Sequence, residues 1–252
     1  MLMGCLTIAQ EPGGGRSALS AFRAWKAEPE NASLKWGDAL KEYRAKLRRD
    51  GLEEAVVEST LRLITAYDEG EFYDEIYAGE PTFNPRPNAF LVEAVAGLRP
   101  GKALDVGMGQ GRNAIYLAGL GWEVTGFDVS AEGLERAQEQ ARAGGLAVTA
   151  VHLADVEFPF GLEQWDLIVI VHALEKRSVH RVHDALRPGG YVLVEASHIE
   201  PGGFPFGYES NELLKIFQGF RIVRYEEVMG SHDFSQDRSK PQSLVRILAQ
   251  KP

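Results

Sequence analysis

The stretch that decides the fold is Asp105-Val106-Gly107-Met108-Gly109-Gln110-Gly111-Arg112-Asn113. It leaves a predicted strand and enters a predicted helix. Glycines at such a junction let the backbone approach a ligand closely, and the helix N-terminus that follows favours negative charge. Asp128 ends the next predicted strand, nineteen positions after Gly109. A carboxylate at that distance can accept hydrogen bonds from both hydroxyls of a ribose, so the pair predicts a nucleotide-type binding site.

Predicted strands and helices alternate around this stretch. The strands are expected at 102–107, 122–127, 146–153, 166–171 and 191–194, and the helices between them at 112–120, 130–143 and 178–186. A helix at 209–217 precedes two last strands, 220–228 and 243–249, which no helix separates. The alternation predicts an α/β fold, a Rossmann-like, doubly wound sheet of seven strands. The sheet is mostly parallel, with an antiparallel hairpin at one edge.

The N-terminal part of the chain carries helix signals and almost no strand signal. We expect residues 1–15 to be a flexible N-terminus, 16–80 a helical extension and 81–252 the α/β domain. Within the extension, Ser33 can cap a helix that ends near Arg49, and a second helix is expected over 52–67. The apolar face of this helical extension must pack against a larger part of the protein.

Composition excludes several classes of function. The chain has 252 residues and a net charge of −9, which argues against a nucleic-acid partner held by phosphate contacts. Its single cysteine, Cys5, excludes an intramolecular disulfide. No apolar run reaches the ~18 residues that cross a bilayer. The short apolar start, residues 1–10, is interpreted as a disordered terminus or as a start inside a longer leader.

The spacing of the glycines limits which class of nucleotide-type ligand the loop is expected to bind. A dinucleotide fingerprint needs glycine three residues after its second glycine, where Arg112 stands. The pattern D-x-G-x-G-x-G resembles motif I of class I S-adenosylmethionine-dependent methyltransferases. Further segments resemble that family in the same order, namely 72–77, 153–156, 165–169 and 186–190. Residues 109–118 are most similar to the tellurite-resistance and thiopurine type, whose members methylate small molecules.

The resemblance implies a methyltransferase with S-adenosylmethionine as cofactor and S-adenosylhomocysteine as product. The positions that match its cofactor site, or lie beside the matching motifs, are Tyr73, Tyr77, Asp105, Gly107, Gly109, Gln110, Arg112, Asn113, Asp128, Val129, Asp155, Val156 and Val171. Because this cofactor is made in the cytoplasm, we expect a cytoplasmic protein, with export as the alternative if the start is the remnant of a leader. The expected partner is a small-molecule substrate, with neither nucleic acid nor membrane, and the protein is expected to be a monomer or homodimer.

Methyl transfer is an in-line displacement, so the site must hold the acceptor collinear with the methyl group and dry. A hydroxyl or protonated amine also needs a base, whereas a thiolate does not. His172 and His198 follow strands at the predicted site edge and are the candidate bases; hydrogen bonds to backbone or carboxylate would explain them equally well. Glu175 and Glu195 also lie near strand ends, and Glu195 is interpreted as a carboxylate near the cofactor or substrate, or as part of a capped turn.

An aromatic loop follows the fifth predicted strand. Residues 199–208 are rich in proline and glycine, and they form either a lid or a surface loop pinned by its aromatics. The candidate substrate-binding residues are Phe83, Phe204, Phe206, Tyr208 and His232. No metal is expected, because His180 and His183 lack a third ligand in the sequence. Two other functions stay open: a non-catalytic cofactor-binding or interaction protein, and a nicotinamide-dependent oxidoreductase.

Overall fold

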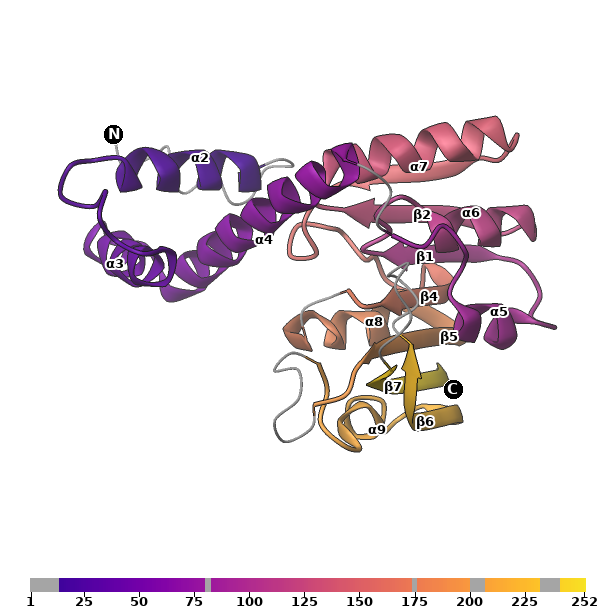
Figure 1. Ribbon diagram of the computed structural model, residues 1–252. Coiled ribbons are helices and arrows are strands. Elements are labelled where there is room, and N and C mark those ends of the chain that lie inside the picture. Colours follow the sequence, from indigo (N-terminus) through magenta and orange to yellow (C-terminus); the bar gives the residue numbers. More distant parts are fainter. Residues whose placement is uncertain (1–13, 80–82, 174–175, 200–206, 232–240) are drawn as a thin grey trace.

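The computed structural model describes residues 14–79, 83–173, 176–199, 207–231 and 241–252. Its centre is a seven-stranded sheet in the order β3-β2-β1-β4-β5-β7-β6 (Figure 1). The parallel strands are β1 (Lys102–Val106), β2 (Glu123–Asp128), β3 (Val148–His152), β4 (Trp165–Val171) and β5 (Leu186–Ser197). β7 (Pro241–Gln250) runs antiparallel between β5 and β6 (Arg221–Ser231). The predicted fold class is therefore confirmed.

Helices cover both faces of the sheet. On β4, Leu167 and Val169 face the side of α5 (Ala89–Val95), α6 (Arg112–Gly119) and α7 (Ala131–Ala143). Ile168 and Ile170 alternate with them and face the side of α8 (His180–Ala185) and α9 (Glu212–Ile216). A short 3-10 helix, η1 (Lys176–Ser178), directly precedes α8. A strand buried on both faces explains the nearly uninterrupted apolar run of β4.

The N-terminal helices form an extension with a core of its own. α2 (Gly14–Lys26) and α3 (Trp36–Arg49) pack against α4 (Glu54–Ala78), and Phe22, Tyr43 and Leu63 are buried among them. Figure 1 shows α2 and α3 at the outer end of α4, whose other end reaches α7. In the described ranges, none of the helices combines the length and the apolar character needed to cross a membrane.

Three contacts fix α4 to the sheet. A Cβ on Gly70 would come within 2.5 Å of the carbonyl oxygen of Val129, so only glycine lets the helix approach this closely. Asp74 Oδ1 accepts from Ser130 Oγ at 2.6 Å, at the start of α7. Tyr67 Oη donates to a carboxylate in the loop after β3 at 2.7 Å. These contacts place α4 beside the loops that follow β2 and β3, where a parallel sheet presents its ligand site.

The extension differs from the sequence prediction in detail. Lys35, and not Ser33, precedes α3, and it makes no side-chain cap. Gly14 and Gly15 begin α2, although the sequence predicted a flexible N-terminus up to residue 15. The Gly15 N–H donates to a glutamate of the β3 loop at 3.1 Å, which holds this helix start in place. The second predicted helix continues past Tyr67 to the end of α4 and takes in the segment 72–77.

Candidate active site

The glycine loop connects β1 to α6 in a conformation that side chains rarely adopt. Gly107, Gly109 and Gly111 have φ angles of 65°, 49° and 80°. There is also no room for a side chain, because a Cβ on Gly109 would overlap the hydroxyl of Tyr77 and one on Gly107 would overlap Ala173. The loop therefore packs between Tyr77 of α4 and Ala173, which follows β4.

Asp128, at the end of β2, is held by the backbone on both sides. Its Oδ2 accepts from the N–H of Gly109 at 2.8 Å, and its Oδ1 accepts from the N–H of Ser130 at 2.8 Å. Burial raises the pKa of Asp128, and these two N–H groups counteract that rise. Ser130 caps α7, because its hydroxyl accepts from the N–H of Gly133 at 3.0 Å. The carboxylate is thus fixed before any ligand arrives.

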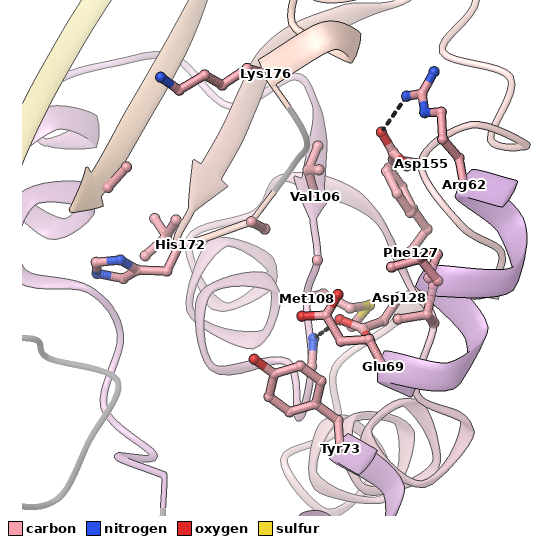
Figure 2. Close-up of a pocket in the computed structure, with 18 of the residues that line it drawn as sticks. Arg62, Glu69, Tyr73, Val106, Met108, Phe127, Asp128, Asp155, His172 and Lys176 are labelled. Atoms are coloured by element: carbon pink, nitrogen blue, oxygen red, sulfur yellow. Dashed lines mark hydrogen bonds and ion pairs between the residues drawn. The ribbon is translucent and has the colours of Figure 1, made fainter. Parts of the chain in front are cut away.

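A cavity of about 1230 Å³ opens above the loop, bounded by α4 and the ends of β1, β2, β4 and β5 (Figure 2). Most of the predicted cofactor residues line it, namely Tyr73, Tyr77, Gly107, Gly109, Gln110, Arg112, Asn113, Asp128, Val129, Asp155 and Val171. Of the predicted substrate residues, Phe83 and Tyr208 line it as well. The Tyr208 hydroxyl has no hydrogen-bond partner in the described part of the chain, and burial raises its pKa to about 12.

One helix forms a whole wall of this cavity. Arg62, Glu69 and Tyr73 project from α4, and Figure 2 shows them across the cavity from His172 and Lys176. The sequence indicated Tyr73 but neither Arg62 nor Glu69. Their positions fall on one helical face, a signal that becomes visible only once the helix is known to continue past residue 67.

Asp155 lies at the other end of the same wall. Its Oδ2 is 3.8 Å from Arg62 Nη2, and it accepts from Ser178 Oγ at 2.5 Å. Arg62 also donates to that serine at 3.0 Å, so the three groups form one small network. The Asp155 carboxylate, in the segment 153–156 that resembles the family, is therefore oriented by α4 and η1.

Two predicted cofactor residues lie outside the cavity lining. Asp105 is only 2% exposed, and its carboxylate accepts from the backbone of Ala114, in the first turn of α6. Burial raises the pKa of Asp105 to about 7. Val156 packs instead against the core of the helical extension. Contrary to the sequence prediction, neither residue therefore lines the cavity, and Asp105 instead joins the end of β1 to the first turn of α6.

His172 lines the cavity directly after β4 in a left-handed conformation, with a φ angle of 53°. Non-glycine residues adopt this region rarely, and such strain is concentrated at functional sites. Its backbone N–H donates to the carbonyl of Glu195 at 2.8 Å, and its Nε2 lies 3.4 Å from Glu195 Oε1. The neighbouring strand therefore orients both the backbone and the ring.

Glu195 is a buried hub and not a lining residue. Its side chain is fully buried, and it accepts from Asn88 Nδ2 at 2.8 Å and from Arg246 Nε at 2.6 Å. Burial alone would raise the pKa of Glu195, but hydrogen bonding from His172 and the charge of Arg246 lower it. The backbone N–H of Asn88 donates in turn to Asn113 at the start of α6. Neither a carboxylate beside the ligand nor a capped turn describes this residue.

The remaining candidate residues are not among the described residues that line the cavity. His198 does not line the cavity; its Nε2 lies 3.6 Å from Glu227, and its Nδ1 lies 3.3 Å from Ser243 Oγ. We therefore do not retain it as a candidate base. Phe204, Phe206, His232 and Glu175 lie outside the described residues.

Comparison with known proteins places the chain in a family. The family model described as tellurite resistance protein TehB matches residues 68–241. A protein named Hemagglutinin 1 from Eikenella corrodens is 29% identical over 176 residues, which cover 64% of this chain and 58% of that protein. A probable S-adenosyl-L-methionine-dependent methyltransferase TehB from Haemophilus influenzae (strain 10810) is 29% identical over 152 residues, or 56% of this chain and 53% of that protein. The chain thus spans little more than half the length of these curated relatives.

A solved structure shares the fold. The crystal structure of TehB from Haemophilus influenzae has a TM-score of 0.58 and 23% identity to this chain, and it covers 73% of this chain and 67% of that one. The family match runs from the inner end of α4 through the glycine loop, Asp128 and His172. It includes most of the cavity described above. This chain belongs to the TehB family of tellurite resistance proteins.

Proposed function

We propose that this chain is an S-adenosylmethionine-dependent methyltransferase that acts on a small-molecule acceptor. The observation that carries the proposal is the hydrogen bond from the Gly109 N–H to Asp128, which fixes a carboxylate beside a bare glycine loop inside a large cavity. The Haemophilus influenzae relative is named for the same activity. The cavity, at about 1230 Å³, has room for a cofactor and an acceptor together, since single-ligand pockets span roughly 300–1,000 Å³.

The residues present fit this cofactor. Gly107 and Gly109 line the cavity and carry no side chain, so a ligand can approach their backbone closely. Asp128 would accept hydrogen bonds from the ribose hydroxyls, and Asp155 from the adenine amino group. Tyr73, Tyr77 and Phe83 would enclose the methionine end, and the rings of Tyr77 and Phe83 lie 5.2 Å apart.

When bound, the cofactor supplies an electrophilic methyl group on a sulfonium ion. The chain has to orient the acceptor, exclude water and, for some acceptors, remove a proton. His172 is the proposed base for a hydroxyl or a protonated amine, with its imidazole held by Glu195 at 3.4 Å. Tyr208 and Phe83 are the proposed acceptor wall, because both line the cavity.

The charge of the chain supports a small acceptor. A net charge of −9 opposes binding to the phosphate backbone of RNA or DNA. We also propose a cytoplasmic location, because S-adenosylmethionine is made in that compartment.

A labelled-methyl assay tests the proposal. The protein would be incubated with methyl-labelled S-adenosylmethionine and a panel of thiols, halides, phenols, amines and metalloid oxyanions. We expect transfer to at least one class, and its loss in Asp128→Ala. Transfer to none of them by a protein that binds the cofactor would contradict catalysis and favour a non-catalytic cofactor-binding protein.

A further inference from the structure

Two carboxylates from distant parts of the sequence lie side by side in the cavity. Figure 2 shows the carboxylates of Glu69, on α4, and Asp128, at the end of β2, next to each other. Both residues line the cavity. Desolvation and then the negative charge of Asp128 raise the pKa of Glu69, as expected for like charges at close range.

The packing of α4 fixes this arrangement. Gly70 follows Glu69, Val129 follows Asp128, and Gly70 lies directly against the Val129 backbone. The contact between Gly70 and Val129 therefore places their chain neighbours, Glu69 and Asp128, next to each other. On the next turn of the helix, the hydrogen bond from Ser130 to Asp74 prevents α4 from sliding along the loop.

The two carboxylates differ in what already binds them. Asp128 accepts one backbone N–H on each oxygen. In the described part of the chain, the Glu69 carboxylate has neither a hydrogen-bond donor nor a cation as its partner. Glu69 is exposed, so in the free protein its carboxylate is open to solvent and repels the like charge of Asp128 beside it. The arrangement becomes favourable when a ligand brings donors to both groups.

We propose that Glu69 is a second ribose-binding carboxylate, contributed by the helical extension, which accepts a hydrogen bond from one hydroxyl of the cofactor ribose beside Asp128. A vicinal diol has two O–H donors. With Asp128 shared between the loop and α7, a second carboxylate gives each hydroxyl an acceptor of its own. This inference rests on the proposed cofactor and makes α4 part of the cofactor site itself.

Calorimetry on two matched variants tests the role of Glu69. The ligands are S-adenosylhomocysteine and its 2′-deoxy and 3′-deoxy ribose analogues. The variants are Glu69→Gln and Glu75→Gln, the latter on an exposed position of α4 that does not line the cavity. We expect S-adenosylhomocysteine to bind Glu69→Gln about tenfold more weakly than the wild type, the effect of one charged hydrogen bond, and Glu75→Gln within about twofold. One of the two deoxy analogues should lose much less affinity on the Glu69→Gln substitution, because it lacks the hydroxyl concerned.

The outcomes are distinguishable. The role of Glu69 is overturned if Glu69→Gln binds S-adenosylhomocysteine as tightly as the wild type does. It is also overturned if Glu75→Gln weakens this binding equally. Either result leaves the proposed function intact. An equal loss for all three ligands overturns the ribose assignment. The free Glu69→Gln protein should unfold at the same temperature as the wild type or higher, because a like-charge contact is removed; a lower temperature would indicate a structural role instead. Failure of the wild-type protein to bind contradicts the proposed function, and this inference with it.

Discussion

The backbone N–H of Gly109 donates to Oδ2 of Asp128 at 2.8 Å, which joins the glycine loop after β1 to the end of β2. The two residues are nineteen positions apart in the sequence, and β1 and β2 pair in parallel register. Parallel neighbours bring their carboxyl ends to the same edge of a sheet. A spacing that only suggested a ligand site in the sequence is therefore a direct contact in the fold.

The substitution Gly109→Ala should damage the loop through two separate effects. The φ angle of 49° is unfavourable for alanine, and the new Cβ would overlap the hydroxyl of Tyr77. We expect a loss of roughly 1–3 kcal/mol in the free energy of unfolding, measured by urea denaturation. The double variant Gly109→Ala/Tyr77→Phe removes the overlapping oxygen and should recover part of this loss. A single variant as stable as the wild type would contradict the described loop.

Asp105 should give the stability of the protein a measurable pH dependence. Its pKa is about 7 in the folded state and close to 3.8 in an unfolded chain. Between these values the folded protein holds the proton more tightly, so stability falls as the pH rises from about 4 to 7 and then levels off. Asp105→Asn lacks this contribution. Between pH 5 and pH 8, the wild type should lose about 2–3 kcal/mol more unfolding free energy than Asp105→Asn does.

The comparison uses the change with pH, so it does not depend on whether asparagine itself fits the site. Asp38→Asn, at an exposed position on α3, is the matched control and should follow the wild type. Parallel pH profiles for the wild type and Asp105→Asn would show that Asp105 is ionised across this range in the folded protein.

His172→Gln should separate acceptors by their need for a base. We expect transfer to a phenol or alcohol acceptor to fall about 10²–10⁴-fold, the usual contribution of a general base. Transfer to a thiol that is already ionised should change much less. S-adenosylhomocysteine affinity should stay within about twofold, and the exposed His183→Gln is the control. Equal losses for phenols and thiols would argue for a positioning role.

The sequence predicts the sheet well because its signals are local. The apolar run 166–171 marks the central strand, and the glycine loop and Asp128 mark the ends of β1 and β2. The sequence is less informative about Asp105, because a motif does not show whether a carboxylate lines a cavity or is buried beneath a loop. Only the packed structure shows that Asp105 is buried.

The α4 wall and the hub at Glu195 depend on contacts between distant segments. Glu69 meets Asp128, and Glu195 meets Asn88 and Arg246, only through the arrangement of the helical extension and the sheet edge. The end of α4 is hard to predict from sequence. A predicted end at Tyr67 leaves out the part of the polar helix face that reaches Tyr73. A pattern read along the chain cannot supply such pairings.

Calorimetric titration of the full chain with S-adenosylmethionine and S-adenosylhomocysteine tests the central claim most directly. We predict saturable binding of both, with one site per chain. We also predict a loss of about 1–3 kcal/mol of binding free energy in Asp128→Ala, the cost of an unmade charged hydrogen bond. The absence of binding by either ligand at high micromolar concentration would contradict this claim.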